Sequence, residues 1–136
     1  MIPIYITYEN QLRSRAVHGP STKELITDAP TDNHGRGETF SPTDLFATAL
    51  GSCMSTMMGI AAEPRGIRLD GTKIYVEKHM SSDPPRRVAK LVVRIDMIAG
   101  IKNEFRPILK TTVETCPVIK SIHPDIVVDL RINYPD

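Results

Sequence analysis

The chain has 136 residues, of which 17 are basic and 16 acidic, and 40% of its residues are hydrophobic. This size and composition predict one globular domain over residues 1–136 and exclude a disordered chain. Because the charges nearly cancel, nothing favours binding to nucleic acid or to a membrane surface, and a small molecule is the expected substrate.

The first part of the chain carries three strand signals. Residues 2–8 place apolar side chains at every second position, which is the period of a strand. Two further strands are expected at residues 12–17 and 22–27, with the turn His18-Gly19-Pro20 between them. The short connections predict a meander. Residues 28–39 are rich in Pro, Asp, Asn and Gly and predict a loop.

A helix start follows this loop. Ser41 is a good N-cap, Pro42 suits the first helical position, and Asp44 stands where a capping box usually has Glu. The helix is expected to continue to about Glu63, because Pro64 stops it.

The stretch from residue 45 to residue 62 contains no charged side chain, although it is about as long as a membrane span. Its Ser, Thr and Gly residues make it a poor helix for contact with lipid. An uncharged helix in a soluble protein is covered by protein on every side, and a chain this short has few residues left to surround it. We therefore expect a second subunit to cover part of the helix in an obligate homodimer.

The second half predicts two more strands, a helix and a final strand. Residues 72–80 and 90–97 are expected to form a hairpin. A helix over residues 103–115 and a short helix over 118–122 follow, and residues 126–133 close the chain as a strand. The expected fold class is therefore α+β, with a mostly antiparallel sheet around a long central helix.

The two cysteines do not make a disulfide scaffold. The N-terminus lacks the pattern of a signal peptide, so we expect a reducing, cytoplasmic location. Cys53 lies about three turns into the long helix, too far for the helix dipole to activate it. A thiolate that attacks a peroxide becomes a sulfenic acid, which a second thiol such as Cys116 can condense with. The same spacing is equally compatible with two buried cysteines that only fill space in the core and take no part in chemistry.

Three segments resemble the OsmC/Ohr family: Phe40–Cys53, Thr115–Val118 followed by Ser121–Pro124, and Thr27–Pro30. The resemblance implies an OsmC-like fold and an intertwined homodimer with active sites at the subunit interface. It implies that Cys53 reduces organic hydroperoxides or hydrogen peroxide and that Cys116 resolves it as a disulfide. An external dithiol would then restore both thiols.

The resemblance also implies an arginine that activates the first thiol. Arg13 is the matching position and Arg15 the neighbouring possibility, since a guanidinium is always charged and stabilises a thiolate. The characterised reductases pair this arginine with a glutamate ten residues before the first cysteine. Here that position is Thr43, and the nearest carboxylate is Asp44, the expected capping residue. The alternative is therefore a family member without peroxidase activity that binds a small apolar ligand at the dimer interface.

No metal or cofactor is expected. The four histidines have no paired spacing typical of zinc ligands. The methionines that flank Cys53 fit either the core or an apolar pocket. These residues are His18, His34, His79 and His123, and Met54, Met57 and Met58.

Overall fold

The computed structural model describes residues 1–135 and confirms the α+β class. Its elements are β1 (Ile4–Asn10), β2 (Arg13–His18), β3 (Glu24–Asp28), η1 (Thr31–Asn33), α1 (Pro42–Ala62), η2 (Glu63–Arg65), β4 (Lys73–Met80), β5 (Val88–Asp96), η3 (Asn103–Phe105), α2 (Arg106–Glu114) and β6 (Val127–Asn133). The chain divides into two compact units, an N-terminal unit, Met1–Phe46, and a C-terminal unit, Ala47–Asp136. The expectation of a single domain stays a prediction.

The N-terminal unit contains the predicted meander. β1, β2 and β3 form an antiparallel sheet in that order. Residues 10–12 connect β1 to β2 with positive φ angles of 82°, 52° and 61°. β1 is exposed along its whole length, and Ile4 and Ile6 are 61% and 69% exposed. The chain thus leaves an apolar strand uncovered.

The loop after β3 returns to the sheet and is held by its backbone. The N–H of Asp28 donates to Phe40 O at 3.1 Å, and the N–H of Gly37 donates to Ala29 O at 3.2 Å. A Cβ at Gly35 would lie 1.7 Å from Ala29 O. Only glycine allows this close approach of two backbone segments.

α1 begins as predicted, with a capping box. The Ser41 N–H donates to Asp44 Oδ2 at 2.8 Å, and the Asp44 N–H donates to Ser41 Oγ at 3.0 Å. The helix ends at Ala62, one residue before the expected end, and Gly66 follows with φ of 65°. Local capping chemistry therefore fixes both ends of α1.

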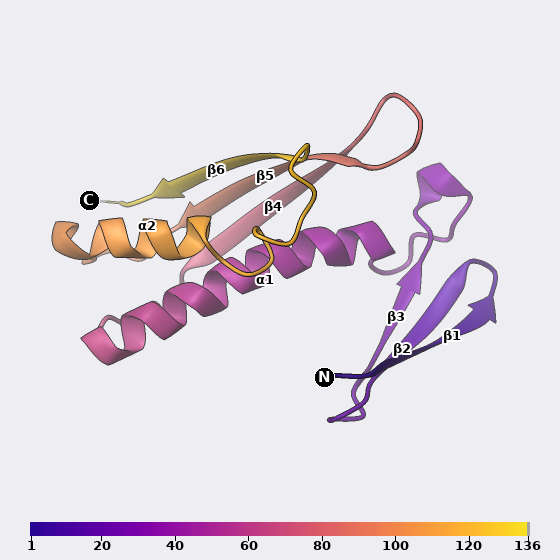
Figure 1. Cartoon of the computed structure of the whole chain (residues 1–136), viewed down its shortest axis with the longest axis horizontal. Coiled ribbons are helices and arrows are strands. Elements are labelled where there is room, and N and C mark those ends of the chain that lie inside the picture. The colour runs from indigo at the N-terminus through magenta and orange to yellow at the C-terminus, as the bar shows by residue number, and fades with distance from the viewer. Residues whose placement is uncertain (136) are drawn as a thin grey trace. The chain divides into compact units, whose positions relative to one another are not determined.

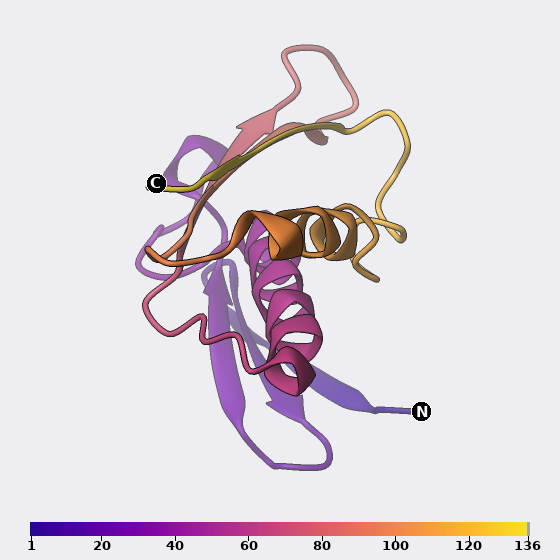
Figure 2. The same ribbon diagram turned by 90° about the vertical axis from the view of Figure 1, so that its left-hand side faces the viewer.

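In the C-terminal unit, α1 and α2 lie on the same side of the β4–β5–β6 sheet (Figures 1 and 2). Gly51 allows α1 to approach the sheet closely, since a Cβ there would lie 2.8 Å from Val76 Cγ2 of β4. One face of α1 is buried, comprising Ala47, Leu50, Gly51, Met54, Met58 and Ala62. Met54 and Met58 are thus core residues, which was one of the two expectations for these methionines.

The opposite face of α1 is rich in small polar side chains, and Ser52, Ser55 and Thr56 are exposed. By length and composition, the segment Pro42–Arg65 could cross a membrane, and 33% of its most apolar 18-residue stretch is buried inside the protein. The core helix of a soluble protein meets the same test, and the buried face of α1 packs in this way.

The sheet of the C-terminal unit has the order β4-β5-β6. β4 and β5 form the predicted antiparallel hairpin, whereas β6 pairs with β5 in parallel. The strands thus make two three-stranded sheets in which only the β5–β6 pairing departs from the antiparallel pattern. A parallel pair needs a long crossover, and the segment that contains α2 provides it.

One expected element is absent from the crossover. Residues 118–122, predicted as a short helix, form hydrogen-bonded turns instead. The N–H groups of Ser121 and Ile122 both donate to Val118 O, at 2.9 and 3.1 Å. A segment this short gains too few hydrogen bonds to offset the cost of helix nucleation.

Candidate functional site

The C-terminal unit brings the two cysteines together. Cys53 projects from α1 and is half-buried, whereas Cys116 follows α2 and is fully buried. The Cys53 side chain lies close enough to Cys116 to influence the pKa of its thiol. The Ile119 N–H donates to Cys116 Sγ at 3.4 Å. Two thiols 63 positions apart in the sequence are therefore neighbours in the fold.

The surroundings of Cys116 favour its neutral form. Burial raises the pKa of the Cys116 thiol, the Ile119 N–H opposes this rise, and the neighbouring Cys53 adds to it. Removing a thiolate from water is unfavourable, so Cys116 stays protonated at neutral pH. Because the protonated Cys116 thiol is buried beside the more exposed Cys53 thiol, a reactant from solvent meets the Cys53 sulfur first.

Arg13, the predicted activating arginine, belongs to the N-terminal unit and is held by two carboxylates. Its Nε and Nη2 donate to Asp28 Oδ1 and Oδ2 at 2.7 and 2.8 Å, and Nη2 also donates to Glu38 Oε2 at 2.9 Å. The guanidinium fork matches the carboxylate and fixes the orientation of Arg13.

Asp28 is 1% exposed. Hydrogen bonding by Arg13 holds the pKa of the Asp28 carboxyl below its usual range, although burial opposes this. Asp28 is therefore ionised at neutral pH, and the Arg13–Asp28 pair is a charged clamp between β2 and the end of β3.

Asp28 and Glu38 were not predicted as partners of Arg13. Part of the signal is present in the sequence, because a hairpin that turns at residues 18–22 places Arg13 opposite Asp28, as the observed register does. Glu38 lies in the loop, where no periodicity fixes its position.

Arg15 and Asp44 have other partners. Arg15 pairs with Glu9 and, at 3.0 Å, with Glu24, and both partners are partly exposed. Asp44 accepts the Ser41 N–H in the capping box. The catalytic roles assigned to Arg13, Arg15 and Asp44 stay predictions.

α1 and β4 border an open hollow of about 350 Å³, which Cys53 does not line. Ser52 and Ser55 line it from α1, and Thr72 lines it from the residue before β4. Thr72 Oγ1 is buried and has no hydrogen-bond partner among residues 1–135. Hydroxyl groups thus surround this side of the cysteine helix.

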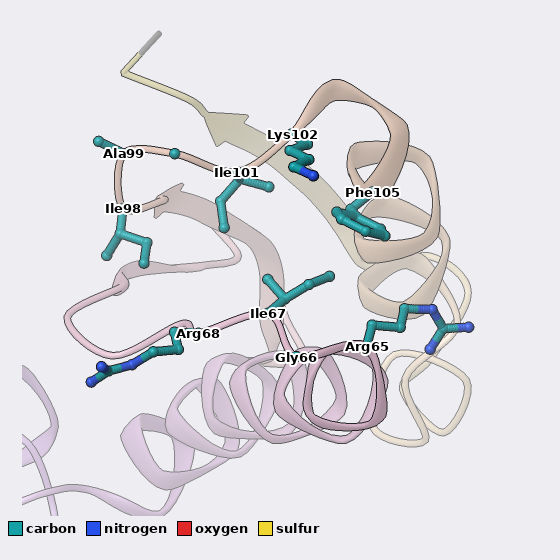
Figure 3. Close-up of a pocket in the computed structure, with 10 residues that line it drawn as sticks. Arg65, Gly66, Ile67, Arg68, Ile98, Ala99, Ile101, Lys102 and Phe105 are labelled. Atoms are coloured by element: carbon teal, nitrogen blue, oxygen red, sulfur yellow. The ribbon is translucent and has the colours of Figure 1, made fainter.

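A second hollow of about 400 Å³ lies at the C-terminal end of α1 (Figure 3). The side chains of Ile67, Ile101 and Phe105 line it together with cationic residues such as Arg65. Arg65 donates to Ala61 O at 2.6 Å and so caps the carbonyl end of α1. A cation at this end of a helix stabilises the helix itself.

The described residues contain no group of three or more His, Cys, Asp or Glu side chains that could hold a metal ion. Three of the histidines have nearby partners in turns or on strands. His18 Nδ1 lies 2.6 Å from Ser21 Oγ, His79 pairs with Glu77, and His123 pairs with Asp125.

The fold described above is that of a known family. The family model for OsmC-like protein matches residues 35–131, and the chain belongs to this family. Among curated proteins, none matches the chain.

Solved structures agree with this assignment. A protein of Psychrobacter arcticus 273-4, named for osmotic stress induction and a detoxification response, is 46% identical with a TM-score of 0.92, over 98% of this chain and 96% of that chain. An organic hydroperoxide resistance protein OsmC from Legionella pneumophila is 16% identical with a TM-score of 0.77, over 98% and 96% of the two chains. One from Bacillus subtilis is 14% identical with a TM-score of 0.71, over 98% of each chain. The last two show the fold.

Proposed function

We propose that this protein is a thiol-dependent hydroperoxide reductase in which Cys53 reacts with the peroxide and Cys116 resolves the product. The proximity of Cys53 and Cys116 in the C-terminal unit is the observation that carries the proposal. Membership of the OsmC-like family supports it. So do the names of the Legionella and Bacillus proteins of the same fold, which refer to organic hydroperoxide resistance.

The reaction proceeds in three balanced steps. The Cys53 thiolate attacks one peroxide oxygen, the O–O bond breaks, and the other oxygen leaves as an alcohol after taking a proton. Cys53 is then a sulfenic acid. The Cys116 thiol condenses with it, forms the S–S bond and releases water. An external dithiol reduces this disulfide by exchange and is itself oxidised to a disulfide.

Burial supports the proposed division of roles between the two cysteines. Cys53 is half-buried and Cys116 is fully buried, so a substrate reaches Cys53 first. Because burial raises the Cys116 pKa, that residue remains a thiol until the sulfenic acid forms beside it. A resolving thiol that stays protonated does not compete for the peroxide.

Arg13 is the proposed cation that stabilises the Cys53 thiolate. Its side chain is 22% exposed and fixed by Asp28, whereas Arg15 is more exposed and pairs only with surface carboxylates. A fixed guanidinium loses less entropy on binding an anion than a mobile one does. In this proposal Glu38 takes the part of the carboxylate that Thr43 cannot supply.

The proposed assembly is an intertwined, cytoplasmic homodimer. The exposed apolar strand β1 supports it, since a soluble chain rarely leaves such a surface bare. Light scattering on a sizing column is expected to give a dimer. The variant Ile6→Glu is expected to dissociate it, while Val127→Glu on β6, at a similar exposure, leaves the dimer intact. A stable wild-type monomer would contradict this assembly.

The test of the reaction is peroxide consumption by purified protein, with cumene hydroperoxide as substrate and dithiothreitol as reductant. Cys53→Ser is expected to abolish turnover. In the absence of dithiothreitol, Cys116→Ser is expected to consume one peroxide per chain and to stop at a Cys53 sulfenic acid. Ser55→Ala on the same helix is the control and is expected to retain full activity. Unchanged turnover in Cys53→Ser refutes the proposal.

A second function, binding of a small apolar ligand without peroxidase chemistry, is favoured by one observation. Two carboxylates already neutralise Arg13, and Thr43 stands at the position of the family glutamate. This alternative predicts slow oxidation of Cys53 and a ligand that copurifies with the protein. Fast, saturable peroxide reduction would exclude it as the main role.

A further inference from the structure

The turn that follows α2 holds the backbone around Cys116 in a fixed conformation. The Lys120 N–H donates to Cys116 O at 3.1 Å. The Ser121 hydroxyl closes the same turn, because its Oγ donates to Pro117 O at 2.7 Å. Neither of these hydrogen bonds involves the Cys116 sulfur. They position the turn without drawing on the group that the proposed reaction uses.

In this turn the Ile119 N–H donates to Cys116 Sγ at 3.4 Å. The arrangement is that of a helix cap, in which a side chain accepts the N–H three residues later and a proline follows the cap residue. Serine, threonine, asparagine and aspartate are the usual cap residues, and a neutral thiol sulfur is a weak acceptor. Hydrogen bonds to an ionised group are about twice as strong as neutral ones. The Ile119 N–H therefore stabilises a Cys116 thiolate more than it stabilises the thiol.

This difference matters because Cys116 has no access to solvent. Its side chain is 0% exposed, so water cannot stabilise a negative charge on the sulfur. Burial raises the pKa of the Cys116 thiol, and the Ile119 N–H opposes that rise. Whenever the reaction places charge on this sulfur, the backbone donor supplies part of the stabilisation that water would otherwise give.

Reduction of the Cys53–Cys116 disulfide is a step that places charge on one of the two sulfurs. A thiolate that attacks one sulfur of a disulfide expels the other sulfur as a thiolate. Cys53 is half-buried and Cys116 is fully buried, so a reductant from solvent reaches the Cys53 sulfur. Attack at Cys53 makes Cys116 the leaving group.

Given the proposed reductase function, on which this step depends, we infer that the external dithiol attacks the Cys53 sulfur and that the Ile119 N–H stabilises the departing Cys116 thiolate. The attacking thiolate forms an S–S bond with Cys53 as the Cys53–Cys116 bond breaks. The electron pair of the broken bond goes to Cys116, which then takes a proton. The second thiol of the reductant displaces Cys53 from the mixed disulfide and leaves the reductant oxidised to a disulfide.

The site of attack is tested on the full-length protein after oxidation with one equivalent of cumene hydroperoxide. Glutathione, a monothiol, is added to the disulfide form, the reaction is quenched with N-ethylmaleimide, and the peptides are mapped by mass spectrometry. Glutathione is expected on Cys53 and N-ethylmaleimide on Cys116. Glutathione on Cys116 would overturn the inference while leaving the peroxide chemistry intact. Failure of the peroxide to produce a Cys53–Cys116 disulfide would overturn the proposed function together with the inference.

The role of the backbone donor is tested by replacing Ile119 with its α-hydroxy acid, which turns the N–H into an ester oxygen and keeps the side chain. Reduction of the preformed disulfide by dithiothreitol is expected to slow about tenfold, because the leaving thiolate loses its donor. The reaction of Cys53 with peroxide is expected to keep its rate.

The same replacement at Ile122 is the matched control. The Ile122 N–H donates to Val118 O, at 3.1 Å, in the same turn and does not reach the sulfur. This analogue is expected to reduce at the wild-type rate, and urea midpoints measure how far each ester destabilises the fold. An unchanged reduction rate with the Ile119 ester, or equal slowing by both esters, would overturn the role of the Ile119 N–H.

Discussion

The two units of this chain are stabilised by different means. In the N-terminal unit the fully buried residues among those described are Asp28 and Ser41, and both act through hydrogen bonds. The C-terminal unit buries a continuous set of aliphatic side chains, including Leu50, Leu91 and Val93. One unit depends on a charged clamp and a helix cap, and the other depends on an apolar core.

This difference indicates what each unit needs. A core of aliphatic side chains supplies most of the favourable free energy of folding in a small domain. The N-terminal unit lacks such a core and exposes Ile4 and Ile6 instead. Directional polar contacts specify its geometry, and the missing apolar burial is what the proposed second subunit would provide.

The largest expected effect on stability comes from a cavity in the apolar core of the C-terminal unit. Leu50→Ala removes a side chain that is 0% exposed, and is expected to lower the free energy of unfolding by about 2–5 kcal/mol. Ile60→Ala on the same helix, at 59% exposure, is expected to change it by less than about 1 kcal/mol. Urea denaturation measures both. Equal effects would show that α1 is not a core helix.

The clamp of the N-terminal unit is tested by Asp28→Asn. This change keeps the shape of the side chain but leaves Arg13 without its bidentate partner, so the melting temperature is expected to fall by roughly 5 °C or more. Asp70→Asn is the control, because Asp70 pairs with Arg68 on the surface and both side chains are more than 75% exposed. A fall no larger than in the control would show that Asp28 contributes nothing special.

The same variant also tests the charged clamp through the dependence of stability on pH. Because hydrogen bonding by Arg13 lowers the Asp28 pKa below its usual value of 3.8, the stabilisation is present above pH 3.8 and is lost as the pH falls below it. Between pH 5 and pH 3 the wild-type protein is therefore expected to lose more stability than Asp28→Asn does. Denaturant midpoints at the two pH values decide this, and parallel losses would contradict the prediction.

The smallest effect is expected at the helix cap. Ser41→Ala removes the oxygen that accepts the Asp44 N–H, which costs about 1 kcal/mol. Ser55→Ala, in the exposed part of the same helix, is expected to be nearly neutral. A change in the urea midpoint with Ser41→Ala no larger than with Ser55→Ala would show that the box is dispensable.

Much of the fold could be predicted because local chemistry decides it. Ser41, Pro42 and Pro64 set the limits of α1, and apolar alternation locates the strands. The direction of β6 could not be predicted, since alternation identifies a strand but not its neighbour. Residues 118–122 failed as a helix because a propensity signal this short is easily outweighed by hydrogen-bonded turns.

The candidate site was predictable only in part. The residue types and the family resemblance selected Cys53 and Cys116, but their contact depends on the packing of the crossover, which no spacing reveals. Glu38 was missed for the same reason, since its contact with Arg13 arises from the path of a loop.

The parallel pairing of β5 and β6 has a consequence for synthesis of the chain. β5 buries Leu91, Val93 and Ile95 fully, and its second edge stays open until β6 has left the ribosome. An open apolar strand edge is a template for intermolecular pairing. The nascent protein is thus most prone to aggregate between the completion of β5 and the emergence of Asn133, a window of nearly forty residues in which a chaperone has the most to protect.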